Sequence, residues 1–539
     1  MVIALSNSGF LMVKKSGIKI LKKTHSLCPK CNKILPADIF VKNNKVYITR
    51  MCRKHGKTEE LYFGDYEMYK RFEEWAHDGK GIENPQIKKA RPTCPEDCGL
   101  CNIHKSHTAL GNIVVTNRCD LQCFYCFFYA KAMGYVYEPT LGQIRSMLRS
   151  MAQEKPVPSN AVQLTGGEPA LRNDIIDIIK IAKEEGYDHI QLNTNGIRLA
   201  NEPGFAEKIR KAGVSTIYLS FDGVTSRTNP KNHWEIPNIL RNCRAAGVGI
   251  VLVPTVINGV NDHEVGDILE FGMKHVDVVR GINYQPVSLV GRISSAERKK
   301  YRITIPDVIE RMENQTDGMV RKEDFYPVPT VSALTHFVEA VTNKPKYELT
   351  SHFACGAATY LFIEDGGAVP LPRFVDIKGM MSYLDDRAED IKNGKNKTWT
   401  LLKTARAVGR FIDKKKQPKG LSLTSMMFNI LVKRDYGALG ALHEKSLFVG
   451  MMHFMDKFNF DVERVKRCCI HYGVPDGKIL PFCTFNVIPE WYRDDIQKKF
   501  SLSIPEWEKM TGRKLSDDFY KRNPEEMKKI PDNLLEMEI

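Results

Sequence analysis

The sequence lacks a long apolar run, an N-terminal targeting signal and an internal repeat of fixed period. No stretch reaches the roughly 18 consecutive apolar residues that span a bilayer, which excludes an ordinary transmembrane helix. The first residues do not combine a basic flank, an apolar segment and a small-residue cleavage site, which excludes a secretory signal. We therefore expect a cytoplasmic protein.

Acidic side chains are in the minority. The 539 residues include 79 Lys and Arg against 64 Asp and Glu, which gives a formal net charge of +15. Such an excess favours anionic partners such as nucleic acid, nucleotides or lipid head groups, and it is equally compatible with an ordinary solvated surface. Because a chain of this length exceeds one compact core, we expect two or three domains.

Nearly all of the 14 cysteines fall into tight groups. In a small secreted chain such groups would suggest disulfides. In a large chain without a secretory signal they indicate metal binding, because the cytoplasm keeps thiols reduced.

The chain divides into three segments of different pattern. Residues 1–108 alternate short apolar stretches with cysteine groups and look too polar to fold without metal, so we expect a Cys-rich N-terminal metal-binding domain. Residues 109–300 alternate short apolar strands with helical periods, which is typical of parallel βα units. Residues 301–539 lose this alternation and predict a mainly helical C-terminal domain that carries an auxiliary cluster and contacts the substrate.

Six strands are predicted in the middle segment. They lie near Ile113 to Val115, Ala161 to Leu164, Ile190 to Asn193, Ile217 to Ser220, Val251 to Pro254 and Ile282 to Gln285. Thr140 and Gln143 predict a capping box for the first intervening helix, and Asn173 predicts the cap of the next. The fold class is therefore expected to be α/β, a partial (β/α)6 barrel with its ligands at the C-terminal ends of the strands.

Three cysteines directly follow the first predicted strand. Cys119, Cys123 and Cys126 form a CxxxCxxC loop with Tyr125 before the last cysteine. Three thiolates can ligate three irons of a 4Fe-4S cubane and leave the fourth iron open to an outside ligand. Zinc with an outside fourth ligand, or three buried thiols, are the alternatives.

Small and polar residues end the next three predicted strands. They are Gly166, Gly167 and Glu168 after the second strand, Asn193 and Asn195 after the third, and Ser220 and Asp222 after the fourth. Glycines let the backbone approach a ligand closely, and the polar groups could contact it. Each polar residue could equally begin a loop or cap a helix.

The cysteine loop and the Gly166-Gly-Glu-Pro motif closely resemble those of the radical S-adenosylmethionine (SAM) superfamily. The resemblance implies that SAM binds the open iron and that Cys119, Cys123 and Cys126 are catalytic. It also implies that the strand-end residues contact the amino, carboxylate and ribose groups of SAM. An electron from the cluster would break a carbon-sulfur bond and leave a 5'-deoxyadenosyl radical, so a reductant such as ferredoxin or flavodoxin is expected.

A mononuclear metal site is predicted near the N-terminus. Cys28 and Cys31 form a CxxC pair, Cys52 supplies a third thiolate, and His55 stands three residues later. This spacing is typical of a zinc ribbon or a rubredoxin-like site, and the ligands do not separate Zn from Fe. His55 could equally be a surface residue.

Two more cysteine groups predict auxiliary 4Fe-4S clusters. Cys94, Cys98 and Cys101 repeat the CxxxCxxC spacing without a preceding strand, with His104, His107 or a distant residue as fourth ligand and tetrahedral zinc as the alternative. Four later thiolates suffice to ligate a cluster fully, as in the SPASM and twitch domains of radical SAM enzymes. They are Cys355, Cys468, Cys469 and Cys483.

Nearly the whole chain resembles the archaeal tetraether lipid synthases, also called GDGT or macrocyclic archaeol synthases. The likeness is carried by the run Cys94 to Cys101, Arg373 to Asp376, Phe448 to Met455 with His453, and Pro481 to Asn486. It implies an enzyme that joins the terminal carbons of isoprenoid chains on an archaeal diether lipid. Related archaeal sequences are also regarded as methylases acting on a pterin precursor, which is the alternative.

Two segments bear on the lipid hypothesis. Residues Trp399 to Ile412 read as a basic amphipathic helix that suits an anionic lipid surface, with peripheral contact at the inner membrane face, or as an ordinary surface helix. The runs Met426 to Val432 and Leu447 to Met455 could line an apolar groove or form core.

A protein of another class is also compatible with the composition. Several zinc-like cysteine groups and a basic charge would fit a zinc-containing nucleic-acid-binding protein with an inert barrel. The motifs at the predicted strand ends argue against it, so we expect no nucleic-acid partner.

Overall fold

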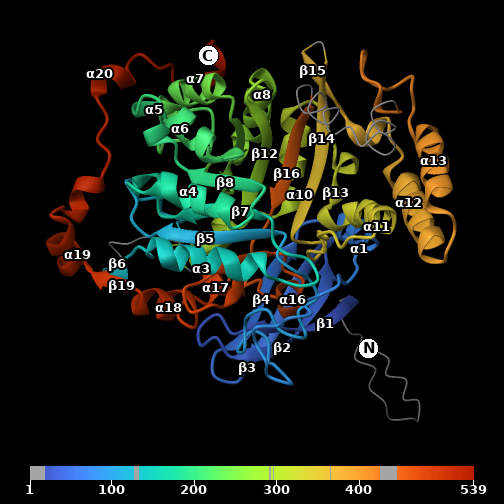
Figure 1. Cartoon of the computed structure of the whole chain (residues 1–539), viewed down its shortest axis with the longest axis horizontal. Coiled ribbons are helices and arrows are strands. Elements are labelled where there is room, and N and C mark those ends of the chain that lie inside the picture. Colours follow the sequence, from blue (N-terminus) through green and yellow to red (C-terminus); the bar gives the residue numbers. More distant parts are fainter. Residues whose placement is uncertain are drawn as a thin grey trace, which may run out of the picture.

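The computed structural model describes residues 19–126, 133–290, 293–294, 296–364, 366–424 and 446–538. It places a large sheet with helices around it beside a smaller N-terminal sheet, with helices α12 and α13 projecting on one side (Figure 1). The predicted α/β class is confirmed, with its partial barrel, Cys-rich N-terminal part and many C-terminal helices.

The N-terminal part is a four-stranded antiparallel sheet followed by one helix. Its elements are β1 (Lys19–Leu27), β2 (Ile34–Lys42), β3 (Lys45–Cys52), β4 (Gly56–Phe63) and α1 (Tyr66–Glu73), with strand order β1-β2-β3-β4. Alternate residues such as Val46 and Ile48 are fully buried, as expected for a sheet with one covered face. Asp65 begins α1, because its side chain accepts a hydrogen bond from the backbone N–H of Met68.

The six predicted barrel strands are confirmed. They are β5 (Leu110–Thr116), β7 (Ala161–Gly166), β8 (His189–Thr194), β9 (Thr216–Ser220), β10 (Gly249–Val253) and β12 (Val279–Pro286). All neighbours in this series pair in parallel. The intervening helices are α3 (Leu141–Ala152), α4 (Ile175–Glu184), α5 (Ile197–Asn201), α6 (Phe205–Ala212), α7 (Ile236–Ala246) and α8 (Val265–Lys274). Of the short strands, β11 (Thr255–Val256) pairs with β12, and β6 (Tyr135–Tyr137) lies outside the barrel sheet.

One predicted helix cap is confirmed and one is wrong. Thr140 and Gln143 form the reciprocal capping box of α3. Helix α4 instead begins after Asp174, which makes no side-chain cap, and Asn173 lies one residue too early. The reason is that Arg172 holds both carboxylate oxygens of Asp174, at 2.7 and 2.6 Å.

Strands from the C-terminal part extend the barrel sheet at both edges. They include β13 (Tyr326–Pro327), β14 (Gly356–Glu364), β15 (Gly367–Pro370), β16 (Ser446–Met452), β17 (Ile470–Gly473) and β18 (Ile479–Pro481), while β19 (Ser501–Ser503) pairs with β6. Strand β16 pairs in parallel with β12, and β17 pairs in parallel with β5. Residues far apart in the chain therefore form one continuous wall around the barrel's interior.

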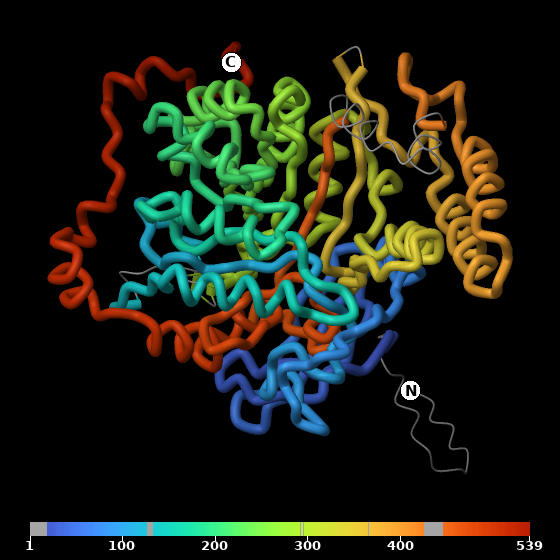
Figure 2. Tube along the Cα trace, in the orientation of Figure 1, coloured from blue at the N-terminus to red at the C-terminus, as the bar shows by residue number. Residues whose placement is uncertain are grey.

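The C-terminal part also contributes many helices. They are α9 (Arg298–Tyr301), α10 (Ile305–Gln315), α11 (Ser332–Thr342), α12 (Ile377–Lys392), α13 (Lys397–Ala407), α16 (Val462–Lys466), α17 (Phe482–Val487), α18 (Arg493–Lys499), α19 (Ile504–Thr511) and α20 (Pro524–Met527). The last segment runs along the outside of the barrel and returns to its helices (Figure 2). There the backbone N–H of Leu534 donates to the carbonyl of Val224.

One hydrophobic cluster runs through all three predicted segments. It includes Ile39 of the N-terminal sheet, the barrel residues, Leu447 of β16 and Leu534 near the C-terminus. The boundaries expected at residues 108 and 300 stay a prediction.

The amphipathic segment Trp399 to Ile412 packs on the protein itself. It forms α13 and the 3-10 helix Val408–Phe411, and Val408 and Ile412 are buried in a cluster shared with α12. Its apolar side is thus covered by the protein's own core, while Trp399 is exposed. The run Met426 to Val432 lies outside the described residues. Within the described chain, no helix is both long enough and apolar enough to cross a bilayer.

Candidate active site and metal centres

A cavity of about 660 Å³ runs through the barrel interior, from first strand residues such as Leu110 and His189 to the C-terminal ends of the strands. Nearly every residue that the sequence placed at the SAM site lines it: Cys119, Cys123, Tyr125, Cys126, Gly166, Gly167, Glu168, Asn193, Asn195 and Ser220. The exception is Asp222, which is buried and does not line the cavity. Because these residues come from β5, β7, β8 and β9, their meeting at one edge follows from the parallel strand order.

The two glycines fit the end of β7 against the cluster loop. A Cβ atom on Gly166 would collide with the carbonyl oxygen of Thr116, and one on Gly167 with that of Arg118. Gly166 also has a φ of +147°, which side chains disfavour. The backbone N–H of Gly167 donates to Thr116 O at 2.8 Å, and that of Glu168 to Arg118 O at 2.7 Å. The two glycines are therefore required because the end of β7 lies in close backbone contact with the cysteine loop and positions it.

Glu168 is buried and fully engaged by the protein. Its carboxylate accepts hydrogen bonds from the backbone of Ala170, the hydroxyl of Thr194 and the backbone of Asn195, at 2.7 to 2.9 Å. Burial, and then the nearby charge of Asp120, raise the pKa of Glu168 to about 8. The residue thus ties the ends of β7 and β8 together at the cavity wall.

The two asparagines after β8 have different roles. Asn195 donates to the Asp120 carboxylate at 2.6 Å and accepts from the backbone of Ile197 at 3.0 Å, so it joins the start of α5 to the cysteine loop. Asn193 donates to the hydroxyl of Thr165 at 3.1 Å and faces the cavity. Ser220 faces the same cavity from β9.

Asp222 connects β9 to the cysteine loop through Tyr125. The Tyr125 hydroxyl donates to the Asp222 carboxylate, whose other oxygen accepts from the backbone of Thr255 at 2.9 Å. Lys231 completes the group, with its Nζ 2.7 Å from Asp222 and 3.0 Å from the Tyr125 hydroxyl. Lys231 is 7% exposed and lines the cavity. Sequence reasoning missed it, because a lysine in a loop gives no local signal of burial.

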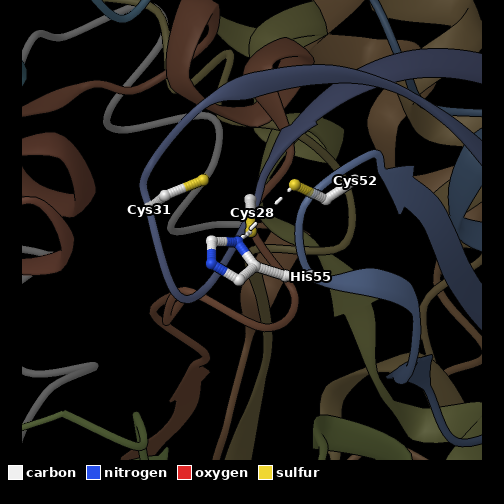
Figure 3. A group of neighbouring side chains, drawn as sticks. All are labelled: Cys28, Cys31, Cys52 and His55. Atoms are coloured by element: carbon white, nitrogen blue, oxygen red, sulfur yellow. Dashed lines mark hydrogen bonds between the residues drawn. The ribbon is translucent and has the colours of Figure 1, made fainter.

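The N-terminal cysteines and His55 converge on one point. Ligand atoms of Cys28, Cys31, Cys52 and His55 all lie within 4.8 Å of one another. Figure 3 shows the three thiols around the imidazole, whose Nδ1 is 3.3 Å from Cys28 Sγ and 3.6 Å from Cys52 Sγ. Three sulfurs and one nitrogen in this arrangement suit tetrahedral zinc. The structure places the His55 imidazole close enough to the cysteines to be the fourth ligand.

The three cysteines of the second CxxxCxxC group lie beside a small cavity. Cys94, Cys98 and Cys101 line it together with His104 and Lys466. The imidazole of His104 instead engages the carbonyl of Cys468 at 2.9 Å, and His107 accepts from the backbone of Glu348 at 3.0 Å. Neither histidine is directed at the three thiols, so the structure gives no support to either as the fourth ligand.

The four C-terminal cysteines lie near one another, and two of them, Cys355 and Cys483, lie near the buried side chain of Arg464. The guanidinium Nε of Arg464 donates to Cys355 Sγ at 3.2 Å, and the backbone of Met455 donates to Cys483 Sγ at 3.4 Å. Burial, then the charges of Cys483 and Cys469, hold the pKa of Cys468 well above its ordinary value. Among the residues that the structure describes, the Nη1 of Arg464 has no hydrogen-bond partner. A donor set of four thiols with a spare buried cation fits an anionic metal cluster.

The cavity in the barrel has two different walls. Strands β7 to β12 contribute mostly amides and hydroxyls: Gln163, Thr165, Gln191, Asn193, Tyr218, Asn283 and Gln285. The opposite side, from β14, β16 and the loops beyond, contributes mostly apolar and aromatic groups: Val328, Tyr360, Phe448, Met452, Phe454 and Phe482. Neither wall was predicted as a unit, because its members come from many separate strands.

Comparison with known proteins adds two family matches. Residues 113–272 match the radical SAM superfamily, and residues 20–64 match the HMPTM N-terminal zinc ribbon domain. The chain is 44% identical over 500 residues to a 7,8-dihydro-6-hydroxymethylpterin dimethyltransferase of Methanocaldococcus jannaschii, which covers 91% of this chain and 97% of that protein. This radical SAM chain belongs to the family of that relative.

Two weaker likenesses each cover less than half of the chain. The chain is 30% identical over 221 residues to a GTP 3',8-cyclase of Clostridium acetobutylicum, covering 39% of this chain and 68% of that protein. Native anSMEcpe with bound AdoMet is a solved structure at 13% identity with a TM-score of 0.29, covering 44% of this chain and 68% of that one.

The tetraether lipid synthase prediction is wrong. The relative that matches almost end to end is named for a pterin substrate, so the diether lipid as partner and the coupling of isoprenoid carbons are not supported. Residues that carried the resemblance contribute to the SAM cavity and to the C-terminal cysteine group instead. Phe448 and Met452 face the cavity from β16, and Cys483 lies in the C-terminal cysteine group.

The radical SAM enzyme uses SAM and a 4Fe-4S cluster, and its N-terminal part suits Zn or a similar metal. Cys119, Cys123 and Cys126 fit the cluster, because three thiols border one cavity beside the glycine motif. Burial raises the pKa of Cys119 and Cys123, so these thiols would stay protonated without a bound metal. A bound cluster and bound SAM would together supply a radical able to remove a hydrogen atom from a substrate.

Proposed function

We propose that this radical SAM enzyme is a methylase that acts on a reduced pterin, with SAM as the source of the radical that removes a hydrogen atom from the substrate. The observation that carries the proposal is the 44% identity to the dimethyltransferase, which extends over 97% of that protein's length. Identity at this level spans the zinc ribbon, the barrel and the C-terminal cysteines, and is therefore not confined to the chemistry common to all radical SAM barrels.

The two walls of the cavity support a flat heterocyclic substrate. A pterin has apolar ring faces and an edge of alternating hydrogen-bond donors and acceptors. Gln163, Gln191 and Asn283 offer amide groups on one side, and Tyr360 and Phe448 offer aromatic surface on the other. Amide groups can pair with both donors and acceptors, so this wall matches such an edge.

The same wall disfavours an isoprenoid chain. A saturated chain would cover these amides without offering any hydrogen bond, and each buried polar group left unpaired costs about 1–3 kcal/mol. A flat polar ring satisfies the groups that a lipid would leave unpaired.

Several further roles belong to the proposal. Cys94, Cys98 and Cys101, and the set Cys355, Cys468, Cys469 and Cys483, would each hold an auxiliary cluster. A reductant of the ferredoxin or flavodoxin class would supply electrons. The polar residues at the strand ends, together with Lys231, would bind SAM. The enzyme would be located in the cytoplasm.

The test uses the anaerobically reconstituted, reduced enzyme with SAM and 7,8-dihydro-6-hydroxymethylpterin. We expect 5'-deoxyadenosine together with a pterin whose mass rises by whole methyl additions in mass spectrometry. A parallel incubation with archaeal diether lipid should leave the lipid unchanged. Formation of 5'-deoxyadenosine without a methylated pterin, or a new carbon-carbon bond in the lipid, would overturn the proposal.

A further inference from the structure

A second cavity, of about 370 Å³, lies apart from the SAM cavity. Its walls come from Lys22 of β1, from the end of α1 and the residues after it, from the segment Ser351 to Phe353, and from Arg467 after α16. It therefore lies between the N-terminal sheet and the loop that leads to Cys355. None of its lining residues belongs to the radical SAM site.

The imidazole of His352 has a fixed hydrogen-bonding role at one nitrogen. The backbone N–H of Ala354 donates to its Nδ1 at 3.2 Å, so Nδ1 must carry the lone pair. The ring is 3% exposed. An imidazole whose Nδ1 accepts a hydrogen bond is neutral and carries its hydrogen on Nε2.

That Nε2–H faces a second donor. The ammonium Nζ of Lys22 lies 3.2 Å from His352 Nε2, and neither group can accept from the other. Within the described residues, no carboxylate lies within 4.0 Å of the Lys22 ammonium. Two donors thus meet at the cavity wall without an acceptor between them.

The remaining charges of the cavity are mostly committed elsewhere. Asp78 pairs with Lys105 at 2.8 Å and with Arg467 at 2.7 Å, and Arg467 also pairs with Glu463 at 2.7 Å. Glu73 is exposed at the rim and forms no ion pair among the described residues. The Ser351 hydroxyl makes no hydrogen bond to another described residue and adds a third donor. The inner wall is therefore rich in donors that lack acceptors.

We propose that this cavity binds the phosphate group of a small phosphorylated metabolite. A tetrahedral phosphate presents several acceptor oxygens, so one oxygen can accept from Lys22 and His352 Nε2 while another accepts from Ser351. The cavity exceeds the size of a phosphate ion, which leaves room for the organic part beside the Phe353 ring. The bound group would join β1 to the segment that precedes Cys355.

The test measures phosphate binding to the metal-loaded enzyme by isothermal titration calorimetry at constant ionic strength. The probes are inorganic phosphate, glycerol phosphate and succinate. We expect both phosphates to bind and Lys22→Met to weaken each by about tenfold or more, because a charge-assisted hydrogen bond is lost. Lys23→Met removes an exposed charge from the neighbouring position of β1 and should leave the affinity unchanged.

Ser351→Ala is the second variant and should weaken phosphate binding without altering the zinc or iron content. Tighter binding of glycerol phosphate than of inorganic phosphate would identify a phosphorylated metabolite as the ligand. Equal binding would identify free phosphate as the ligand. Either result supports a phosphate site in this cavity. Equal phosphate affinity in the Lys22→Met and Lys23→Met proteins would overturn the proposal. So would succinate binding as tightly as phosphate, or no phosphate binding by the unmodified enzyme. These readouts do not depend on the pterin reaction.

Discussion

The ammonium group of Lys231 lies 2.7 Å from the carboxylate of Asp222. Both side chains are buried, and the same ammonium contacts the hydroxyl of Tyr125 in the cysteine loop. The pair therefore connects the end of β9 to the loop that would hold the catalytic cluster. Removing one partner would leave a buried charge unpaired, which costs about 3–5 kcal/mol.

We expect Lys231→Met to lower the rate of 5'-deoxyadenosine formation by about tenfold or more and to raise the KM for SAM, because the loop loses its anchor at the cavity wall. Lys231→Arg should restore part of both. The double variant Lys231→Met with Asp222→Asn should recover thermal stability without recovering activity. If Lys231→Met changes only stability, the residue has no positioning role.

Gly167→Ala should displace the cysteine loop. Its Cβ would collide with the backbone carbonyl of Arg118, which cannot move without breaking the contacts at the end of β7. The expected result is loss of most of the iron bound at the catalytic site, seen in the electron paramagnetic resonance (EPR) spectrum of the reduced protein.

Gly142→Ala is the matched control. Gly142 lies in α3, and the nearest atom to its added Cβ is Thr140 Oγ1 at 3.9 Å. Alanine there should be neutral or stabilise the protein by up to about 1 kcal/mol, because it reduces the entropy of the unfolded chain. Similar iron loss in both variants would contradict the proposed steric cause.

The zinc and iron sites should separate in metal analysis. Cys52→Ser removes one of four converging ligands and should abolish zinc binding while the iron and acid-labile sulfide remain. Cys123→Ala should retain zinc, lose only the iron and sulfide of the catalytic cluster, and eliminate 5'-deoxyadenosine formation. Cys243→Ala, in helix α7 and away from the four cysteine groups, should change neither metal content. Zinc retained by the Cys52 variant would exclude the four-ligand site.

Arg464 should control the redox behaviour of the C-terminal cysteine group. Its guanidinium is fully buried and donates to Cys355 Sγ, so it offsets the negative charge of a cluster held there. Arg464→Gln should lower the midpoint potential of that cluster in an EPR-monitored titration. The potential of the Arg464→Lys protein should lie between those of the unmodified and the Arg464→Gln proteins. An unchanged potential would show that the arginine only fills space.

Glu154 should make stability depend on pH. Burial raises the pKa of Glu154 to about 7, although hydrogen bonds from Thr108 act in the opposite direction. Since the folded state holds this proton more tightly than the unfolded state, the free energy of unfolding should fall as the pH rises from about 4.5 to about 7. Glu154→Gln should flatten this part of the plot of melting temperature against pH. A profile unchanged by the substitution would rule out Glu154 as the cause.

The sequence alone determined the parts of this protein that depend on local patterns. The six barrel strands, the capping box of α3 and the cysteine loop each follow from residues close together in the chain, where periodicity, hydrogen bonding and ligand spacing act. The four side chains that converge at the N-terminal metal site were also candidates from the sequence, with His55 left open between ligand and surface residue. They lie at the turn between β1 and β2 and at the turn between β3 and β4.

Only the tertiary structure decided how distant segments meet. The pairing of β16 with β12 and of β17 with β5 completes the cavity, yet nothing local in either segment specifies its partner. Lys231 and Arg464 gain their roles from burial beside groups far away in the chain. The motifs identified the radical SAM chemistry, whereas the cavity walls come from many strands and exist only once the sheet has formed.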